Sequence, residues 1–151
     1  MSIDDLLLRT RTGLTRLTPE QAWAMTRAGD GLLADTRPEW QRRRDGEVPD
    51  AVVIERNHLE WRLDPRSAAR VPEASSATVR WIVLCDEGYA SSLAAASLRQ
   101  IGLALATDVI GGFQAWIAAG LPANRPAVPV RPRGPGEGPG VATVAGRVAA
   151  R

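Results

Sequence analysis

Short, mostly apolar segments alternate along this chain with longer stretches in which apolar residues recur at helical spacing. The short segments are rich in β-forming residues and predict buried strands at residues 32–35, 51–54, 81–84 and 107–110. The longer stretches predict helices, which begin near residues 19, 38, 58, 91 and 113. Strands that alternate with helices in this way predict an α/β fold, in which a parallel sheet is covered by helices on both faces.

Residues with known preferences for helix ends mark several of these boundaries. Thr18, Pro19 and Gln21 form a capped helix start, with Thr as the cap and Pro in the first turn. Gly102 follows the helix predicted from residue 91 and is a typical residue for ending it. A further short helix is expected at residues 3–8.

By composition the chain divides into three parts. Residues 1–14 are expected to be an N-terminal helical extension, and residues 15–122, which start with a short edge strand, hold the alternating pattern of one domain. Residues 123–151 are rich in Pro, Gly and Arg, and after Leu121 the chain has no Leu, Ile, Phe or Trp. Such a segment cannot bury enough apolar surface to offset its conformational entropy, so we expect a disordered tail.

Charge is distributed unevenly. The net charge is +2, but residues 122–151 hold five arginines and a single acid, which leaves residues 1–121 with fourteen arginines and sixteen acids. The charge of the predicted domain therefore gives no support to nucleic-acid binding. No apolar run is long enough to cross a membrane, the first residues lack the charge order of a signal peptide, and a single cysteine permits no internal disulfide. These features favour a cytoplasmic protein without a membrane partner.

Cys85, the only cysteine of the chain, lies between a predicted strand and a predicted helix. A lone cysteine at the end of an apolar run is most often a small buried hydrophobic residue. The residues that follow it, Asp86, Glu87, Gly88 and Tyr89, instead indicate a tight loop that leads into a helix of small residues. The loop amides and the helix N-terminus would stabilise a thiolate, the nucleophilic form of cysteine, and Gly88 would let the backbone turn towards the sulfur.

Three residues with chemical or conformational potential stand at the ends of predicted strands. Asp35 is the last residue of a predicted strand, and Cys85 and Gly111 each directly follow one. In parallel sheets, ligands bind beyond the carboxyl ends of the strands. We therefore expect these residues to face one site. His58 is the only histidine, which gives little support to a histidine-based metal site or to a Cys–His pair.

Four segments resemble the landmarks of single-domain rhodaneses, in the order and at the spacing of that family. They are residues 33–37 (Leu-Ala-Asp-Thr-Arg), 46–51 (Gly-Glu-Val-Pro-Asp-Ala), 85–91 (Cys-Asp-Glu-Gly-Tyr-Ala-Ser) and 111–116 (Gly-Gly-Phe-Gln-Ala-Trp). The family's usual forms are Asp-x-Arg, Gly-His-Ile-Pro-Gly-Ala, Cys-x-x-Gly-x-Arg-Ser and Gly-Gly-x-x-x-Trp. Residues 56–65 also resemble a stretch typical of rhodanese-like proteins from actinobacteria, and the whole resemblance covers residues 15–122.

The resemblance implies a five-stranded parallel sheet with helices on both faces, and sulfur transfer as the activity. A cysteine thiolate would attack the outer sulfur of a donor, thiosulfate or a persulfide, and the cysteine persulfide would pass that sulfur to a thiol or to cyanide. Cys85 would be the nucleophile. The substrate-binding loop would consist of Asp86, Glu87, Gly88, Tyr89, Ala90 and Ser91. No metal or organic cofactor is implied. The partners would be a small sulfur donor and a thiol acceptor, or a persulfidated protein.

The loop departs from the family at the position of its arginine, which is Ala90 here. Asp86 and Glu87 also add negative charge beside the sulfur, so we expect thiosulfate, a dianion, to suit the loop less well than a thiol-based persulfide. Two other classes of function stay open. The domain could bind partners or sense redox or sulfur state without turnover. A phosphatase or arsenate reductase is a more remote alternative, since it needs an arginine to wrap the oxyanion.

Asp35 and Arg37 have two interpretations. Arg37 either supports the thiolate or the bound anion, or forms a structural ion pair with Asp35 that ties the strand end to the next helix. We favour the ion pair, because structural pairs also gather near functional sites. Tyr89 either takes part in recognition or covers the rim of the loop.

Overall fold

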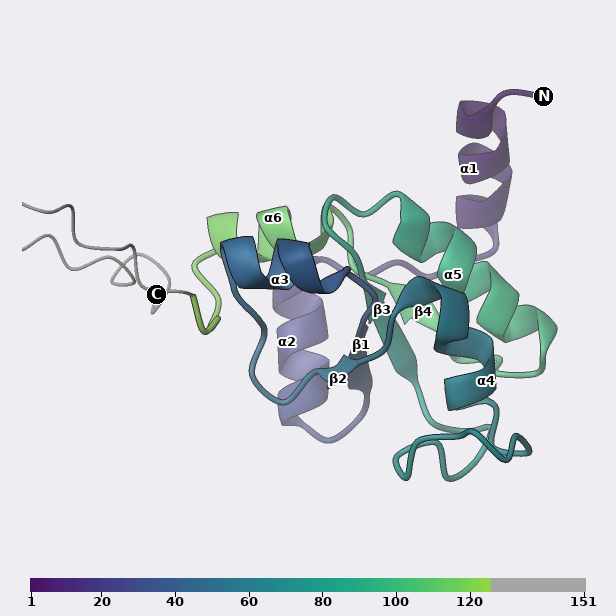
Figure 1. Ribbon diagram of the computed structural model, residues 1–151. Coiled ribbons are helices and arrows are strands. Elements are labelled where there is room, and N and C mark those ends of the chain that lie inside the picture. The colour runs from purple at the N-terminus through teal and green to yellow at the C-terminus, as the bar shows by residue number, and fades with distance from the viewer. Residues whose placement is uncertain (126–151) are drawn as a thin grey trace, which may run out of the picture.

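The structure, a computed structural model, describes residues 1–125. At its centre is a parallel sheet with the strand order β2-β1-β3-β4 (Figure 1). The strands are β1 (Leu32–Asp35), β2 (Val52–Val53), β3 (Trp81–Leu84) and β4 (Thr107–Asp108). β1 and β3 pair along their whole length, so both end at the same edge of the sheet. The predicted α/β fold with a parallel sheet is confirmed.

Among the described residues the sheet has four strands, where the resemblance implied five. The edge strand expected at residues 15–18 is reduced to one parallel bridge between Leu17 and Val109. The Leu17 amide donates to the carbonyl of Asp108 at 3.0 Å, and its carbonyl accepts from the amide of Ile110 at 2.8 Å. The chain cannot continue this pairing, because Thr18 already caps the next helix. A fifth segment thus lies beside β4 without forming a strand.

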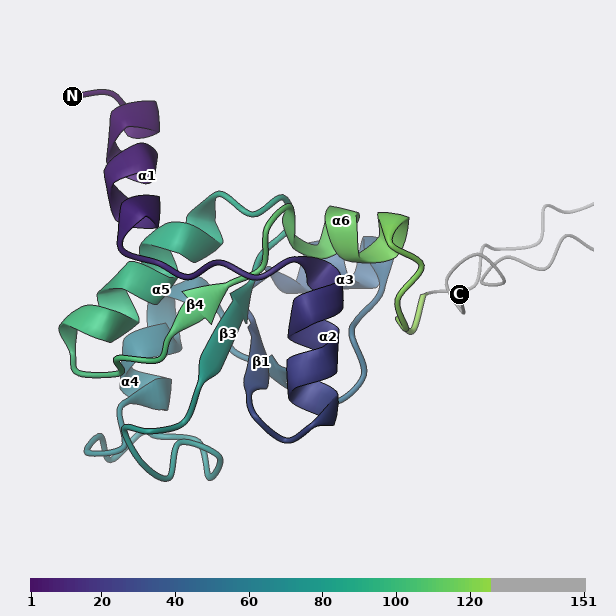
Figure 2. The same ribbon diagram turned by 180° about the vertical axis from the view of Figure 1, so that it is seen from behind.

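Helices cover both faces of the sheet (Figures 1 and 2). On one face lie α2 (Pro19–Arg27) and α6 (Gly112–Ala118), with α3 (Glu39–Asp45) beside α6. On the other face lie α5 (Ala90–Gln100) and α4 (Leu59–Leu63), which follows the short 3-10 helix η1 (Arg56–His58). None of the helices in residues 1–125 combines the length and the apolar character needed to cross a membrane.

Alternate residues of β3 enter two separate cores. Trp81 and Val83 pack against α4 and α5, whereas Ile82 and Leu84 pack against α2 and α6. All four side chains are fully buried. In a central parallel strand, successive side chains point to opposite faces of the sheet, and helices cover both faces. No position of β3 is therefore exposed, which explains why residues 81–84 are all apolar.

The first helix, α1 (Ile3–Thr12), projects from the body of the protein beside one end of α5 (Figures 1 and 2). It begins at a capping box, in which the Asp5 amide donates to Oγ of Ser2 and the Ser2 amide donates to the Asp5 carboxylate. The Ser2 amide and the Ser2 hydroxyl both donate to the Asp5 carboxylate and so hold the pKa of Asp5 below its usual range. The helix continues to Thr12, beyond the expected residues 3–8.

The end of the described chain packs against the domain, which corrects the expectation that a tail begins at residue 123. Ala123 is buried in the core next to α6, and Asn124 exchanges two backbone hydrogen bonds with Glu47, at 2.9 and 2.7 Å. Composition could not reveal this contact, because backbone pairing needs no apolar side chain. The remainder of the expected tail, residues 126–151, lies outside the described residues.

Candidate active site

Cys85 follows β3 at the carboxyl edge of the sheet, and its sulfur accepts two hydrogen bonds from the backbone of the next loop. The amide of Gly88 lies 3.2 Å from Sγ and the amide of Ser91 lies 3.4 Å from it. Gly88 has a φ of +84°, as the loop sequence predicted, and a Cβ on it would come within 2.6 Å of the amide nitrogen of Gly111. Glycine therefore lets the loop fold back over the sulfur.

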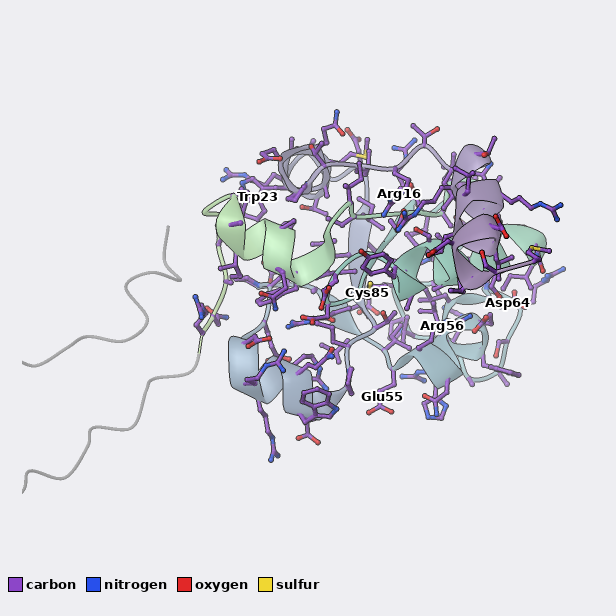
Figure 3. All side chains as sticks on the ribbon, turned by 90° about the horizontal axis from the view of Figure 1, so that it is seen from above. Arg16, Trp23, Glu55, Arg56, Asp64 and Cys85 are labelled. Atoms are coloured by element: carbon purple, nitrogen blue, oxygen red, sulfur yellow. The ribbon has the colours of Figure 1, made fainter. Side chains whose placement is uncertain are left out.

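The sulfur faces a pocket of about 440 Å³ that opens to the surface. Figure 3 shows Cys85 near the centre of the molecule when this edge of the sheet is seen from above. Three segments form the walls: the turn after β1, the turn after β2, and the loop after Cys85 itself. The lining residues are Thr36, Arg37, Pro38, Gln41, Arg56, Cys85, Asp86, Glu87, Tyr89 and Ala90. A small molecule can therefore reach Cys85, although its side chain is largely buried.

The first turn of α6 holds the start of this loop. The amide of Phe113 donates to the carbonyl of Cys85 at 2.8 Å, and the amide of Gln114 donates to the carbonyl of Asp86 at 3.0 Å. A Cβ on Gly112 would lie only 2.5 and 2.6 Å from these two carbonyl oxygens. The Gly-Gly pair before Phe113 thus allows α6 to approach the loop closely. Gly111 contacts the loop through its backbone and does not line the pocket.

The two acids of the loop lie in different surroundings. The Asp86 carboxylate accepts a hydrogen bond from the side-chain amide of Gln114 at 2.9 Å and lies 3.9 Å from Nη2 of Arg44. Its negative charge is therefore partly balanced on the side of α3 and α6. Glu87 is exposed at the pocket. Of the two charges that were expected to repel an anion, that of Asp86 is thus partly compensated, because Arg44 also pairs with Asp45 at 2.6 Å.

Tyr89 and Ala90 form the rim of the pocket next to α5. Tyr89 is 58% exposed, and the guanidinium of Arg11 lies 5.7 Å from the centre of its ring. Ala90 is the first residue of α5 and is exposed. Ser91 points away from the pocket, because its hydroxyl donates to the buried carboxylate of Asp108 at 2.8 Å. Ser91 thus donates to the Cys85 sulfur through its backbone amide, and its hydroxyl binds Asp108 instead.

Arg37 forms a buried ion pair with Asp35, the arrangement that we favoured. Its Nε and Nη2 donate to the two carboxylate oxygens at 3.1 and 2.8 Å, and Nη2 also donates to the carbonyl of Gly46. The guanidinium stacks on Phe113 at 3.8 Å from the ring centre. Within residues 1–125 its Nη1 has no hydrogen-bond partner. Arg37 thus joins the end of β1 to α6 and also contributes to the pocket wall.

Arg56 is the charged residue of the pocket that sequence reasoning missed. It lies at the start of η1, in the turn that follows β2, and reaches the same pocket as Cys85 from another side (Figure 3). Its Nη1 donates to both carboxylate oxygens of Glu60 at 2.8 and 3.0 Å, and Ser97 donates to the same carboxylate. The i,i+4 spacing of Arg56 and Glu60 was the available sequence signal.

Glu60 remains ionised and so keeps Arg56 in place. Burial by itself would raise the pKa of Glu60, but hydrogen bonds from Ser97, from the backbone and from Arg56 outweigh it and hold this pKa below its usual range. Because Nη1 of Arg56 carries both bonds to Glu60, the rest of the guanidinium is available to a ligand of the pocket. In residues 1–125, no cluster of His, Cys, Asp and Glu side chains is suited to hold a metal ion.

Comparison with known proteins assigns the family. Residues 18–119 match the model of the rhodanese-like domain. The chain is 32% identical over 108 residues to the thiosulfate sulfurtransferase GlpE of Actinobacillus succinogenes, a match that covers 72% of this chain and 88% of that protein. The chain therefore belongs to the rhodanese-like domain family, which is the family that its four sequence landmarks indicated.

Solved structures share the same fold. A protein of unknown function from Rhodopseudomonas palustris, described as a possible tyrosine phosphatase, has a TM-score of 0.74 and 29% identity, over 82% of this chain and 95% of that chain. The polysulfide-sulfur transferase homodimer of Wolinella succinogenes has a TM-score of 0.62 and 19% identity, over 81% and 86% of the two chains. At 19% identity, the similarity to the Wolinella succinogenes protein concerns the fold alone.

Proposed function

We propose that this protein is a sulfurtransferase in which Cys85 accepts a sulfur atom from a small donor and passes it to a thiol or to cyanide. The observation that carries this proposal is the position of the Cys85 sulfur, which accepts two backbone hydrogen bonds and faces an open pocket. Membership of the rhodanese-like family and the similarity to a thiosulfate sulfurtransferase support it.

The reaction proceeds in two half-reactions. The Cys85 thiolate attacks the outer sulfur of the donor, the donor's own bond to that sulfur breaks, and the electron pair leaves with sulfite or with a thiolate. Cys85 then carries a persulfide. In the second step an acceptor thiolate or cyanide attacks the outer sulfur of this persulfide, and the Cys85 thiolate leaves. The amides of Gly88 and Ser91 stabilise the negative charge on Sγ at the start and the end of the cycle.

The surroundings of the pocket favour a small anionic donor. Arg56 brings a guanidinium to the pocket from the turn after β2, although the loop itself has Ala90 where the family's usual motif has arginine. The charge of Asp86 is partly balanced by Arg44. Thiosulfate and the persulfide of an anionic thiol both fit this description. The thiosulfate donor, which the loop sequence disfavoured, thus gains support from the tertiary structure.

The two other classes of function have weaker support. A phosphatase or arsenate reductase would need an arginine in residues 86–91 to wrap a tetrahedral oxyanion, and this loop has none. A module that binds partners or senses sulfur without turnover needs no open route from Cys85 to a small acceptor, whereas the pocket offers one.

Intact-mass measurement tests the proposal. The protein is incubated with thiosulfate, with mercaptopyruvate and with glutathione persulfide, and sulfur transfer to cyanide or to a thiol is then followed. We expect the addition of one sulfur atom, removable by dithiothreitol and absent in Cys85→Ser. If no donor loads Cys85, the proposal is wrong. A persulfide that forms but passes to no acceptor would support the sensing or binding module instead.

A further inference from the structure

Two arginines from the segment before the rhodanese-like match contact the active-site loop from behind. Arg11 belongs to α1 and Arg16 lies between α1 and α2, whereas the match to the family begins at residue 18. Nη2 of Arg11 donates to the carbonyl oxygen of Gly88 at 2.8 Å, and Nη2 of Arg16 donates to the same oxygen at 3.0 Å. Figure 3 shows Arg16 and Arg56 on different sides of Cys85.

The backbone of Gly88 connects these arginines to the sulfur. Its positive φ directs the amide towards Sγ of Cys85 at 3.2 Å, while its carbonyl oxygen receives the two guanidinium groups. Two charged hydrogen bonds on one carbonyl oxygen restrict the orientation of that residue strongly. The arginines therefore hold in place the amide that stabilises the Cys85 thiolate.

The second amide donor to the sulfur, Ser91, is held by the same cluster. Its hydroxyl donates to the Asp108 carboxylate at 2.8 Å, and the hydroxyl of Ser92 donates to the same oxygen at 2.8 Å. Arg16 binds both carboxylate oxygens of Asp108 at 2.9 and 3.1 Å, and Nε of Arg11 donates to the Ser92 hydroxyl at 3.0 Å. Gly88 thus contacts both arginines directly, whereas Ser91 is linked to Arg16 through Asp108 and to Arg11 through Asp108 and Ser92.

The cluster also carries an excess of positive charge. Asp108 is fully buried and balances Arg16. Arg11 is not within ion-pair distance of any carboxylate of residues 1–125, and its polar partners there are the Gly88 carbonyl and the Ser92 hydroxyl. One uncompensated, partly buried cation thus lies behind the loop whose other side holds the sulfur. A cation in this position favours a thiolate over a thiol.

We propose that Arg11 is a positioning residue for the chemistry of Cys85, that Arg16 supports it, and that α1 is therefore part of the catalytic unit. Arg11 does not line the pocket; it lies against the ring of Tyr89 at the rim and acts on the sulfur through the backbone of Gly88. Its relevance to sulfur transfer rests on the proposed function, whereas its effect on the Cys85 thiol does not.

The test compares Arg11→Gln with Arg9→Gln in the full chain. Arg9 lies in the same last turn of α1 and is exposed, so it is a matched control. The measurement is the rate of Cys85 alkylation by iodoacetamide, an uncharged reagent, from pH 5 to pH 10. We expect Arg11→Gln to slow alkylation at pH 7 by roughly three- to ten-fold and to move the midpoint of the pH profile upward, because the thiolate loses a nearby cation. Arg11→Lys, which keeps the charge without the guanidinium geometry, should restore part of the rate.

Equal profiles for wild type, Arg11→Gln and Arg9→Gln would overturn the proposal. A lower alkylation rate with an unchanged midpoint would also contradict it, because a merely loosened loop would alter access without altering the thiolate population. Arg16→Gln is less suitable as the main variant, since it leaves the buried Asp108 unpaired and can impair folding. Alkylation needs no sulfur donor, so a shifted profile together with no sulfur loading in wild type would refute the proposed function and still support the role of Arg11.

Discussion

The backbone amide of Phe113 donates a hydrogen bond of 2.8 Å to the carbonyl oxygen of Cys85 and so joins Cys85 to a helix 28 residues further along the chain. This contact requires α6 to start directly against the loop. Gly112, the residue before Phe113, has a φ of +62° and makes that approach possible. The Gly-Gly landmark near the end of the domain thus contributes to the active site without supplying a functional side chain.

Gly112→Ala tests this close approach. The new Cβ would lie 2.5 Å from the carbonyl oxygen of Cys85, which is backbone and cannot move aside without moving the sulfur. We expect the variant to lose at least about 2 kcal/mol in the free energy of unfolding and to show altered Cys85 alkylation. Urea unfolding and the alkylation rate measure the two effects.

Gly102→Ala is the matched control for that variant. Gly102 also has a positive φ, of +99°, but nothing lies within 4 Å of a Cβ built on it. This substitution should cost only the backbone strain, about 1 kcal/mol, and should leave Cys85 reactivity unchanged. Equal effects of the two substitutions would show that α6 does not need to approach the loop as closely as the structure indicates.

Arg56→Gln tests the cation of the pocket. The substitution removes the charge but keeps much of the side-chain length. We expect the KM for thiosulfate to rise by roughly ten-fold or more, because a charge-assisted hydrogen bond contributes roughly 1.5–3 kcal/mol and about 1.4 kcal/mol is a factor of ten. Turnover of an uncharged organic persulfide should change little. Steady-state kinetics with both donors at two ionic strengths measures the difference.

The control for this prediction is Arg43→Gln. Arg43 also pairs with a glutamate four residues away, Glu39, but it lies on the exposed side of α3 and does not line the pocket. Its loss should leave both donors unaffected. If Arg43→Gln and Arg56→Gln raise the KM equally, the effect is one of overall charge and Arg56 has no specific role.

Ala90→Arg introduces an arginine at the position where the family's usual loop motif has one. Position 90 lines the pocket at the first residue of α5, so a guanidinium there can meet an anionic donor held by the loop amides. A charge-assisted hydrogen bond contributes roughly 1.5–3 kcal/mol, and about 1.4 kcal/mol is a factor of ten in rate. We therefore expect thiosulfate turnover to increase by roughly ten-fold or more, with a smaller effect on a neutral donor. No gain at low ionic strength would mean that residue 90 does not face the bound anion.

Two truncations test where the folded domain ends. A chain that stops after Pro122 loses the buried Ala123 and the paired backbone of Asn124, whereas a chain that stops after Arg125 keeps both. The two hydrogen bonds with Glu47 contribute about 1 kcal/mol each, so the shorter chain should unfold at a lower temperature by several degrees. Thermal unfolding followed by circular dichroism compares them. Identical melting temperatures would mean that residues 123–125 add nothing to the stability of the domain.

Local pattern was enough to predict most of the fold. The strand at residues 32–35 and the strand at residues 81–84 have the bounds expected from their apolar runs, and the helix capped by Thr18 begins where predicted. These elements are readable because strand burial and helix capping depend on residues that are close in sequence. For the same reason the position of Cys85 in a strand–loop–helix unit, and the turn at Gly88, followed from the sequence.

Only the tertiary structure decided which distant side chains contact the strand–loop–helix unit around Cys85. Arg56 reaches the pocket from the turn after another strand, and Arg11 contacts the loop carbonyl across 77 residues of chain. The i,i+4 spacing pointed to the pairing of Arg56 with Glu60, but no local pattern showed that Arg56 lines the pocket or that Arg11 contacts Gly88. Arg56 reaches the pocket because the parallel sheet brings the ends of its strands to one edge. Arg11 reaches Gly88 because α1 packs behind the loop that follows β3. The sequence by itself thus determined the candidate nucleophile, Cys85, and the loop around it, whereas folding determined the charges that surround them.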